Sequence, residues 1–383
     1  MITSLEQAIL KNRMWHCLEC GKCSAVCPVT RWETRTYTSP RLLVEKVSQG
    51  GIDEVLNDSL FWSCLTCQRC SQLCPSEVHF SEFLRDVRGL ARDESHCGEC
   101  THGEVIQNWQ RLMTEPELKQ NRLGWLDGNL RVAEQSETLF FTGCLPYYDV
   151  MFKKQGFEGV EIARAAVKIL NHLGIEPAIL PDERCCGHDQ LWQGDIAGFR
   201  ALAEQNMALF KASGARCIVS TCPECVRTLQ VDYAQYVGEH GLKVLHIAEL
   251  LQESELSFAP SSQENIPIRV TYQDPCRLGR HLGVYEAPRQ VIASLGYDLQ
   301  EMERTRQGSL CCGTSCWTAC GQVSKNIQVE RLQEARDTQA DLLVTACAKC
   351  QIHFQCAQSD PALREQLAIP IRDLTTLVAE RLV

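Results

Sequence analysis

The 383-residue sequence lacks several features that would assign it to common protein classes. It has no run of about 18 apolar residues, so we expect no direct membrane insertion. Its first residues, Met1–Glu6, have neither the basic nor the apolar region of a signal peptide, which favours a cytoplasmic location. It has no excess of positive charge, because the formal net charge is −10, and this argues against binding to nucleic acid. No glycine-rich dinucleotide fingerprint follows a predicted strand, so we expect neither flavin nor NAD on this chain.

What the sequence has in abundance is cysteine, with 24 residues. A secreted disulfide framework is one explanation, but such proteins are usually small and carry export signals. In a reducing compartment, this many thiols are better explained as metal ligands. The spacing of the cysteines then indicates which metal they bind.

Two cysteine strings in residues 1–95 have the same spacing. They read Cys17-x-x-Cys20-x-x-Cys23-x-x-x-Cys27-Pro28 and Cys64-x-x-Cys67-x-x-Cys70-x-x-x-Cys74-Pro75. In two-cluster ferredoxins, the fourth cysteine of each string ligates the other cluster. Zinc sites usually use separated Cys-x-x-Cys pairs instead. We therefore predict two cubane [4Fe-4S] clusters, one held by Cys17, Cys20, Cys23 and Cys74 and the other by Cys64, Cys67, Cys70 and Cys27.

The segment between the two strings is longer than in a compact ferredoxin. Residues 39–50 and 51–60 have helical patterns, which indicates an all-α ferredoxin domain over residues 1–95. Residues 96–136 are a polar connector with a predicted helix at Val105–Met113.

The rest of the chain contains an internal repeat of a lone cysteine, a Cys-Cys-Gly and a Cys-x-x-Cys. The two sets are offset by 125 to 132 residues and comprise Cys144, Cys185, Cys186, Cys222 and Cys225, then Cys276, Cys311, Cys312, Cys347 and Cys350. A repeat of this length indicates duplicated domains, predicted at 137–258 and 259–383 with a linker at Ser257–Pro267. Five thiolates exceed what one zinc ion or one cubane needs, so a larger or irregular cluster is indicated.

Each half alternates short β-rich runs with helical segments. This pattern indicates an α/β fold with a largely parallel sheet, whose ligands lie at the carboxyl ends of the strands. The fold class expected for the whole chain is therefore multidomain α+β, an all-α ferredoxin-like domain followed by two duplicated α/β domains. The predicted strands are 138–141, 217–220, 268–272 and 342–345, and the predicted helices are 160–173, 196–212, 288–295 and 323–338.

The repeated motif resembles the CCG domain found in the B subunit of heterodisulfide reductase. With an N-terminal ferredoxin similar to the C subunit, the chain looks like the fused D subunit, and related subunits occur in benzoyl-CoA reductase complexes and beside flavin-based bifurcating subunits. The resemblance implies one non-cubane [4Fe-4S] cluster at each complete motif, and therefore two non-cubane clusters. In heterodisulfide reductases, two such clusters cleave a disulfide between them. The implied ligands are Cys144, Cys185, Cys186, Cys222 and Cys225 for one cluster and Cys276, Cys311, Cys312, Cys347 and Cys350 for the other.

Two residues beside the CCG motifs are candidate catalytic groups. His188 follows Cys-Cys-Gly, and Lys349 lies inside a Cys-x-x-Cys; either side chain could supply a proton or a positive charge to an anionic substrate. A histidine beside a cluster more often tunes its potential through a hydrogen bond. Six cysteines are left without a role: Cys97, Cys100, Cys217, Cys316, Cys320 and Cys356. Among these, Cys97 and Cys100 lie in the segment His96–His102, which could be a fifth metal site, a redox-active thiol pair or an ordinary connector.

The sequence thus predicts an oxidoreductase subunit that passes electrons between ferredoxin-type clusters and paired non-cubane clusters. The substrate implied by the resemblance is a small disulfide such as the coenzyme M–coenzyme B heterodisulfide. The alternative is a pure electron relay without a disulfide substrate. The expected partners are a flavoprotein similar to the A subunit of heterodisulfide reductase or a cytochrome b-type subunit, with other redox subunits. A third interpretation, a colourless zinc scaffold, is distinguished by its metal content.

Overall fold

The computed structural model describes residues 4–34, 36–50, 52–93, 98, 100–254 and 267–382. These residues form two compact units, each described by itself below. Unit 1 comprises 1–112, 187–199 and 310–329, and unit 2 comprises 113–186, 200–309 and 330–383. The predicted linker Ser257–Pro267 lies outside the described residues except for Pro267. The domain bounds given above stay a prediction.

Unit 1 is helical, as expected for its ferredoxin region. The described part of the segment between the two strings forms four helices, and two of them have a side chain that caps the first turn. Ser39 caps one helix by accepting a hydrogen bond from the Leu42 N–H at 3.3 Å, and Asp58 caps another through the Leu60 N–H at 2.9 Å. The helices of unit 1 are α1 Ser4–Lys11, α2 Lys22–Val26, α3 Pro28–Trp32, α4 Pro40–Ser48, α5 Ile52–Leu56, α6 Ser59–Ser63, α7 Arg69–Gln72, α8 Phe80–Asp93, α9 Val105–Leu112 and α12 His188–Gln193.

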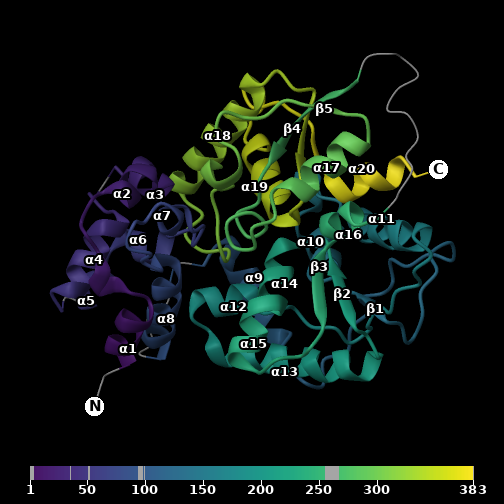
Figure 1. Cartoon of the computed structure of the whole chain (residues 1–383), viewed down its shortest axis with the longest axis horizontal. Helices are drawn as coiled ribbons and strands as arrows, with labels where there is room; N and C mark the ends of the chain where they lie inside the picture. The colour runs from purple at the N-terminus through teal and green to yellow at the C-terminus, as the bar shows by residue number, and fades with distance from the viewer. Residues whose placement is uncertain are drawn as a thin grey trace. The chain divides into compact units, whose positions relative to one another are not determined.

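Unit 2 contains two parallel sheets, one from each repeat (Figure 1). The strand orders are β1-β2-β3 and β5-β4-β6-β7, and β1, β2 and β3 correspond to β4, β6 and β7. The predicted strands at 217–220 and 342–345 are observed with the same bounds. The strands are β1 Thr138–Phe140, β2 Cys217–Ser220, β3 Lys243–His246, β4 Arg269–Gln273, β5 Asp298–Leu299, β6 Leu342–Thr345 and β7 Ile371–Asp373. The mixed helix and parallel-sheet prediction is confirmed.

The helices of the two repeats pack reciprocally in unit 2. α11 of the first repeat contacts α20 of the second, and α16 of the first contacts α17 of the second. Since α11 corresponds to α17 and α16 to α20, the two contacts are related as in a two-fold symmetric pair. The helices are α10 Leu145–Met151, α11 Gly159–His172, α14 Pro223–Arg227, α15 Tyr233–Tyr236, α16 Ile247–Gln252, α17 Glu286–Ser294, α19 Ala348–Gln358 and α20 Leu374–Glu380, with α13 Ile196–Ser213 and α18 Gln322–Asp337 beginning in unit 1.

Apolar side chains explain the helix positions in unit 2. Four apolar side chains of α11 recur at helical spacing and are each at most 2% exposed, namely Ile162, Ala166, Ile169 and Leu170. Burying an isoleucine or leucine side chain contributes about 1.5–3 kcal/mol relative to leaving it in water. Throughout the described part of the chain, no helix combines the length and the apolar character needed to cross a bilayer.

Candidate functional site

Each cysteine string of unit 1 begins with the same backbone turn. Glu19 and Thr66, two residues after the first cysteine of each string, have left-handed φ angles of 51° and 47°. In each turn the backbone N–H of that residue donates to the sulfur of Cys17 or Cys64, with an N···Sγ distance of 3.4 Å. A hydrogen bond to a thiolate favours the charged form. The two strings therefore present their first sulfurs by the same local geometry.

Cys27 lies with the second string. One pocket is lined by Cys27, Cys64, Cys67 and Cys70, the grouping predicted for one cubane cluster. Burial raises the pKa of Cys27, and the nearby Cys67 sulfur raises it further. Burial also raises the pKa of Cys64 to about 12, although the Arg88 guanidinium opposes the shift. Four thiols grouped in one pocket are the donor set that a cubane iron–sulfur cluster uses, so these residues fit such a cluster.

The remaining cysteines of the strings are less closely grouped. Burial raises the pKa of Cys23, and the nearby Cys17 sulfur adds to this. The sulfur of Cys74 accepts a hydrogen bond from the Val78 N–H at 3.4 Å. That Cys20 and Cys74 complete a cluster with Cys17 and Cys23 stays a prediction.

The five cysteines of the first repeat come together in unit 2. Adjacent parallel strands place Cys144 and Cys222 at neighbouring strand ends, because Phe140 of β1 pairs with Val219 of β2. The sulfurs form one continuous series of contacts, Cys144–Cys185–Cys186–Cys225–Cys222, in which the first pair is 3.6 Å apart. Hydrogen bonds among these thiols, together with burial, raise the pKa of Cys186 and Cys225 well above the usual value. Five adjacent thiols match the donor set expected of an irregular cluster.

A buried ion pair joins two of these segments. Glu183, two residues before Cys185, accepts hydrogen bonds from the N–H groups of Thr142 and Gly143 at 3.2 and 2.8 Å. Arg122 lies 2.6 Å from the Glu183 carboxylate and also donates to the Gly143 carbonyl at 2.7 Å. Burial raises the pKa of Glu183 to about 7, while Arg122 and the two N–H groups oppose the shift. The pair thus fixes the turn before Cys144 against the Cys185 loop.

The second repeat contributes three of its cysteines to unit 2. Cys276 follows β4, and Cys347 and Cys350 flank the start of α19, where the Cys350 N–H donates to the Cys347 sulfur at 3.5 Å. Cys311 and Cys312 belong to unit 1, where both are buried. Convergence of all five sulfurs therefore stays a prediction.

The second repeat also has a buried carboxylate two residues before a cysteine. Asp274 precedes Cys276 and accepts two hydrogen bonds from the Arg289 guanidinium, at 2.8 and 2.9 Å. It also accepts from the Arg306 N–H at 2.9 Å. The first repeat uses the Cys-Cys segment for its carboxylate, whereas the second uses the lone-cysteine segment. Each repeat nevertheless has at least one buried arginine–carboxylate pair beside its cysteines.

The two Cys-x-x-Cys segments face each other in unit 2. Glu224 and Lys349 occupy the same position in the two motifs, and the Lys349 ammonium lies 2.5 Å from the Glu224 carboxylate. The Cys350 thiol hydrogen-bonds to Cys347 and lowers its pKa, but burial and the nearby Cys222 sulfur leave that pKa raised. The predicted catalytic candidate Lys349 is therefore buried in an ion pair beside cysteines of both repeats.

His188 and the leftover cysteines have different environments. His188 begins α12 and is buried, with its Nδ1 atom 3.0 Å from Asp189. Cys316 is fully buried, whereas Cys100, Cys320 and Cys356 are partly exposed. Cys217 begins β2 and is only partly buried. Of the segment His96–His102, the residues His96, Cys97 and Glu99 lie outside the described residues.

Sequence reasoning missed the residues that support the cysteines. Arg122, Glu183, Asp274 and Arg289 belong to no recognised motif. A signal for two of them was present, since Glu183-Arg-Cys185 and Asp274-Pro-Cys276 each place an acid two residues before a cysteine. Their arginine partners lie 61 and 15 residues away in the sequence, so only the folded chain shows the pairing.

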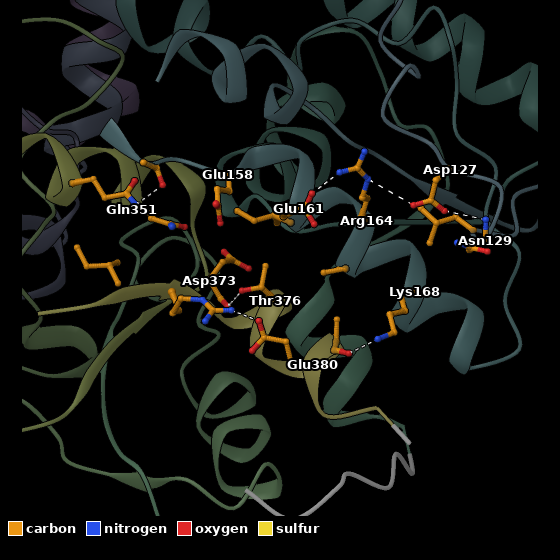
Figure 2. A pocket seen from close by; sticks show the side chains of 18 residues that line it. Asp127, Asn129, Glu158, Glu161, Arg164, Lys168, Gln351, Asp373, Thr376 and Glu380 are labelled. Atoms are coloured by element: carbon orange, nitrogen blue, oxygen red, sulfur yellow. Dashed lines mark hydrogen bonds and ion pairs between the residues drawn. The ribbon is translucent and has the colours of Figure 1, made fainter. Parts of the chain in front are cut away.

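A polar pocket of unit 2 lies between α11 and α20 (Figure 2). Its 18 described lining residues include no cysteine. Asp373, at the start of α20, caps that helix through the Thr375 N–H at 2.8 Å, and its second carboxylate oxygen is buried without a hydrogen bond. The pocket therefore shares no cysteine with the candidate cluster sites.

Comparisons with known proteins agree with this architecture. A family described as "Cysteine-rich domain" (CCG) matches residues 138–230 and 270–355, and a "4Fe-4S dicluster domain" matches residues 13–78.

Three relatives share much of the chain. The D subunit of a dihydromethanophenazine:CoB–CoM heterodisulfide reductase from Methanosarcina acetivorans is 28% identical over 96% of this chain and 93% of its own length. The B subunit of a fumarate reductase (CoM/CoB) from Methanothermobacter marburgensis is 26% identical over 94% of this chain and 71% of its own. An EtfAB:quinone oxidoreductase from Syntrophomonas wolfei is 25% identical over 87% of this chain and 54% of its own. The predicted resemblance is confirmed.

Proposed function

We propose that this chain is the iron–sulfur electron-transfer subunit of a heterodisulfide-reductase-like complex. It carries two CCG domains and a 4Fe-4S dicluster domain, and it is similar over nearly all its length to the D subunit of a heterodisulfide reductase. The observation that carries the proposal is the continuous series of contacts that joins the five cysteine sulfurs of the first repeat. No common structural zinc site uses five thiolates in this way.

We assign eighteen cysteines to four clusters. Two cubane [4Fe-4S] clusters use the two strings with their fourth cysteines exchanged, and two non-cubane [4Fe-4S] clusters each use the five cysteines of one repeat. Such clusters supply one-electron carriers when they are bound. The chain's own residues hold the thiolates in a buried environment, and the Glu183–Arg122 and Asp274–Arg289 pairs fix the segments that carry them. The expected partners are a flavoprotein or a cytochrome b-type subunit.

The finer proposal is reduction of a small disulfide. Cleaving a disulfide to two thiols consumes two electrons and two protons, so the site needs a proton source. Lys349 is a candidate because it is buried beside cysteines of both repeats, where its ammonium group lies 2.5 Å from the Glu224 carboxylate. His188 is the second candidate, through its position directly after Cys-Cys-Gly.

An alternative is a relay subunit without a disulfide substrate. The similarity to an EtfAB:quinone oxidoreductase favours it, because that relative is named for electron transfer to a quinone. In this alternative, Lys349 and Glu224 would serve only to join the two repeats.

Metal and sulfide analysis tests the cluster proposal. Anaerobically purified protein should be brown and contain about sixteen iron atoms and a similar amount of acid-labile sulfide per chain. A colourless protein with stoichiometric zinc and no sulfide would show a zinc scaffold instead. Cys312→Ser should damage one CCG cluster and leave the ferredoxin-type spectra unchanged.

Turnover distinguishes catalysis from relay. The intact complex, supplied with reduced viologen and a panel of disulfides that includes the coenzyme M–coenzyme B heterodisulfide, should oxidise the viologen in a disulfide-dependent way. Absence of turnover with every disulfide, in material of full cluster content, would favour the relay.

A further inference from the structure

The loop 315–320 of unit 1 has an unusual backbone. Cys316, Trp317 and Ala319 have left-handed φ angles of 55°, 56° and 51°. For residues with a Cβ atom, this conformation is unfavourable because the Cβ atom approaches the following carbonyl oxygen. Such strain persists only where the surroundings determine the conformation, and it is concentrated at functional sites.

Side chains of unit 1 hold this loop by its carbonyl groups. The Trp317 carbonyl accepts hydrogen bonds from the Thr101 N–H at 3.1 Å, the Thr101 hydroxyl at 2.7 Å and the Gln107 amide at 3.0 Å. The Cys316 carbonyl accepts from the Gln193 amide at 2.5 Å. With its backbone anchored in this way, Cys316 has a fully buried side chain.

The buried Cys316 thiol meets two residues of α12. One potential ligand atom from each of His188, Asp189 and Cys316 lies within 4.8 Å of the other two. All three side chains are buried, and Cys316 is not among the eighteen cysteines assigned to clusters. The imidazole and the carboxylate are remote from this thiol in the sequence, so the fold alone brings the three groups together.

Hydrogen bonds hold the Asp189 carboxylate in place. The Gln110 amide of α9 donates to one Asp189 oxygen at 2.9 Å, and the other oxygen lies 3.0 Å from His188 Nδ1. Partners of this kind commonly orient metal ligands. Sulfur, nitrogen and oxygen donors that meet at one point are the ligand types of zinc, whose ligands are about 3–4 Å apart when bound. Small side-chain movements would therefore complete the site.

We propose that Cys316, His188 and Asp189 bind one zinc ion, separate from the iron–sulfur clusters. Three protein ligands leave a fourth position for water or another small ligand. The site would link the strained loop to α12 and stabilise the segment that follows each Cys-Cys-Gly. It goes beyond the proposed electron transfer, because zinc carries no electrons.

Metal analysis of the full-length protein tests this proposal. After anaerobic purification, incubation with zinc chloride and desalting, the wild type should retain about one zinc per chain beside its iron. Cys316→Ala should lose this zinc while its iron and acid-labile sulfide stay at the wild-type level. Cys320→Ala is the matched control, because Cys320 lies in the same loop but is not one of the three proposed ligands. This variant should keep the zinc.

Zinc X-ray absorption of the wild type needs no variant and covers the case in which Cys316→Ala does not fold. It should give one sulfur with nitrogen and oxygen neighbours. A sulfur-rich shell would show zinc in cluster sites and would overturn the proposal. So would wild type that retains no zinc, or a Cys316→Ala variant that keeps it. Wild-type protein without iron would instead count against the cluster assignment. Failure of the zinc proposal and failure of the cluster proposal are therefore distinguishable.

Discussion

At the scale of single residues, a buried ion pair lies beside the cysteines of the first repeat. Glu183 and Arg122 are both almost fully removed from water, and the carboxylate also accepts two backbone N–H groups that precede Cys144. A buried pair of this kind is costly to break, because removal of one partner leaves the other uncompensated.

Replacement of Arg122 with Met should therefore lower the free energy of unfolding by about 3–5 kcal/mol. Arg131→Met is the matched control, since the side chains of Arg131 and Glu176 are both at least half exposed and lie 3.7 Å apart. The control should cost less than about 1 kcal/mol. Urea unfolding followed by tryptophan fluorescence measures both. Equal effects of the two substitutions would contradict a structural role for the buried pair.

Asp373 gives a prediction about pH. Burial raises its pKa from 3.8 to about 6, so the folded protein holds the proton more tightly than the unfolded chain. The carboxylate therefore destabilises the fold progressively as pH rises from about 4 to 6, and the effect is constant above that range. It is absent below about pH 4, where both states are protonated.

Asp373→Asn keeps an acceptor for the Thr375 N–H and removes the titration. Relative to wild type, the variant should gain about 2–3 kcal/mol between about pH 4 and pH 6, from the shift of about two pKa units. Unfolding curves at several pH values measure this difference. A difference that does not change with pH would show that Asp373 does not titrate in this range.

At the scale of elements, the approach of α18 to the second Cys-Cys-Gly limits residue size. Gly313 has a φ angle of 97°, and a Cβ atom there would lie 2.8 Å from the Ser324 carbonyl oxygen. Both the left-handed backbone and this contact disfavour any larger residue.

Gly313→Ala should destabilise the protein by about 2–4 kcal/mol, the range of strained or overpacked sites. Gly308→Ala is the control, because a Cβ atom at Gly308 meets open space and its backbone is not left-handed. The control should change stability by less than about 0.5 kcal/mol. Thermal unfolding of the two variants provides the comparison, and equal midpoints would rule out a tight approach at Gly313.

At the scale of the whole molecule, the duplicated repeats of unit 2 associate as a two-fold pair. The reciprocal helix contacts α11–α20 and α16–α17 join equivalent surfaces. Near the centre of such an arrangement, equivalent positions meet each other. Glu224 and Lys349 do so, and their opposite charges make the contact attractive.

Exchange of these charges tests this arrangement. Lys349→Glu alone should destabilise the protein by about 3–5 kcal/mol, because two carboxylates would face each other in a buried position. Glu224→Lys combined with Lys349→Glu should recover more than half of that loss. Urea unfolding of the single variants and the double variant gives the coupling energy. Additive effects would show that the two side chains do not interact.

The sequence by itself determined the local features of this protein. The cysteine spacing predicted the strings and the duplicated motif, and alternation of short apolar runs with helical segments predicted the parallel strands, two of them with the observed bounds. These features are encoded over a few neighbouring residues, because strand and helix periodicity and ligand spacing are short-range properties.

Only the tertiary structure decided how these segments meet. The Glu224–Lys349 contact, the two arginine–carboxylate pairs and the cluster of Cys316 with His188 and Asp189 all join residues that are remote in sequence. Their pairing depends on which helix faces and strand ends are packed together. That packing follows from the burial of apolar surface over the whole unit. Because the hydrophobic effect is non-directional, it leaves no local signal in the sequence that says which segments will meet.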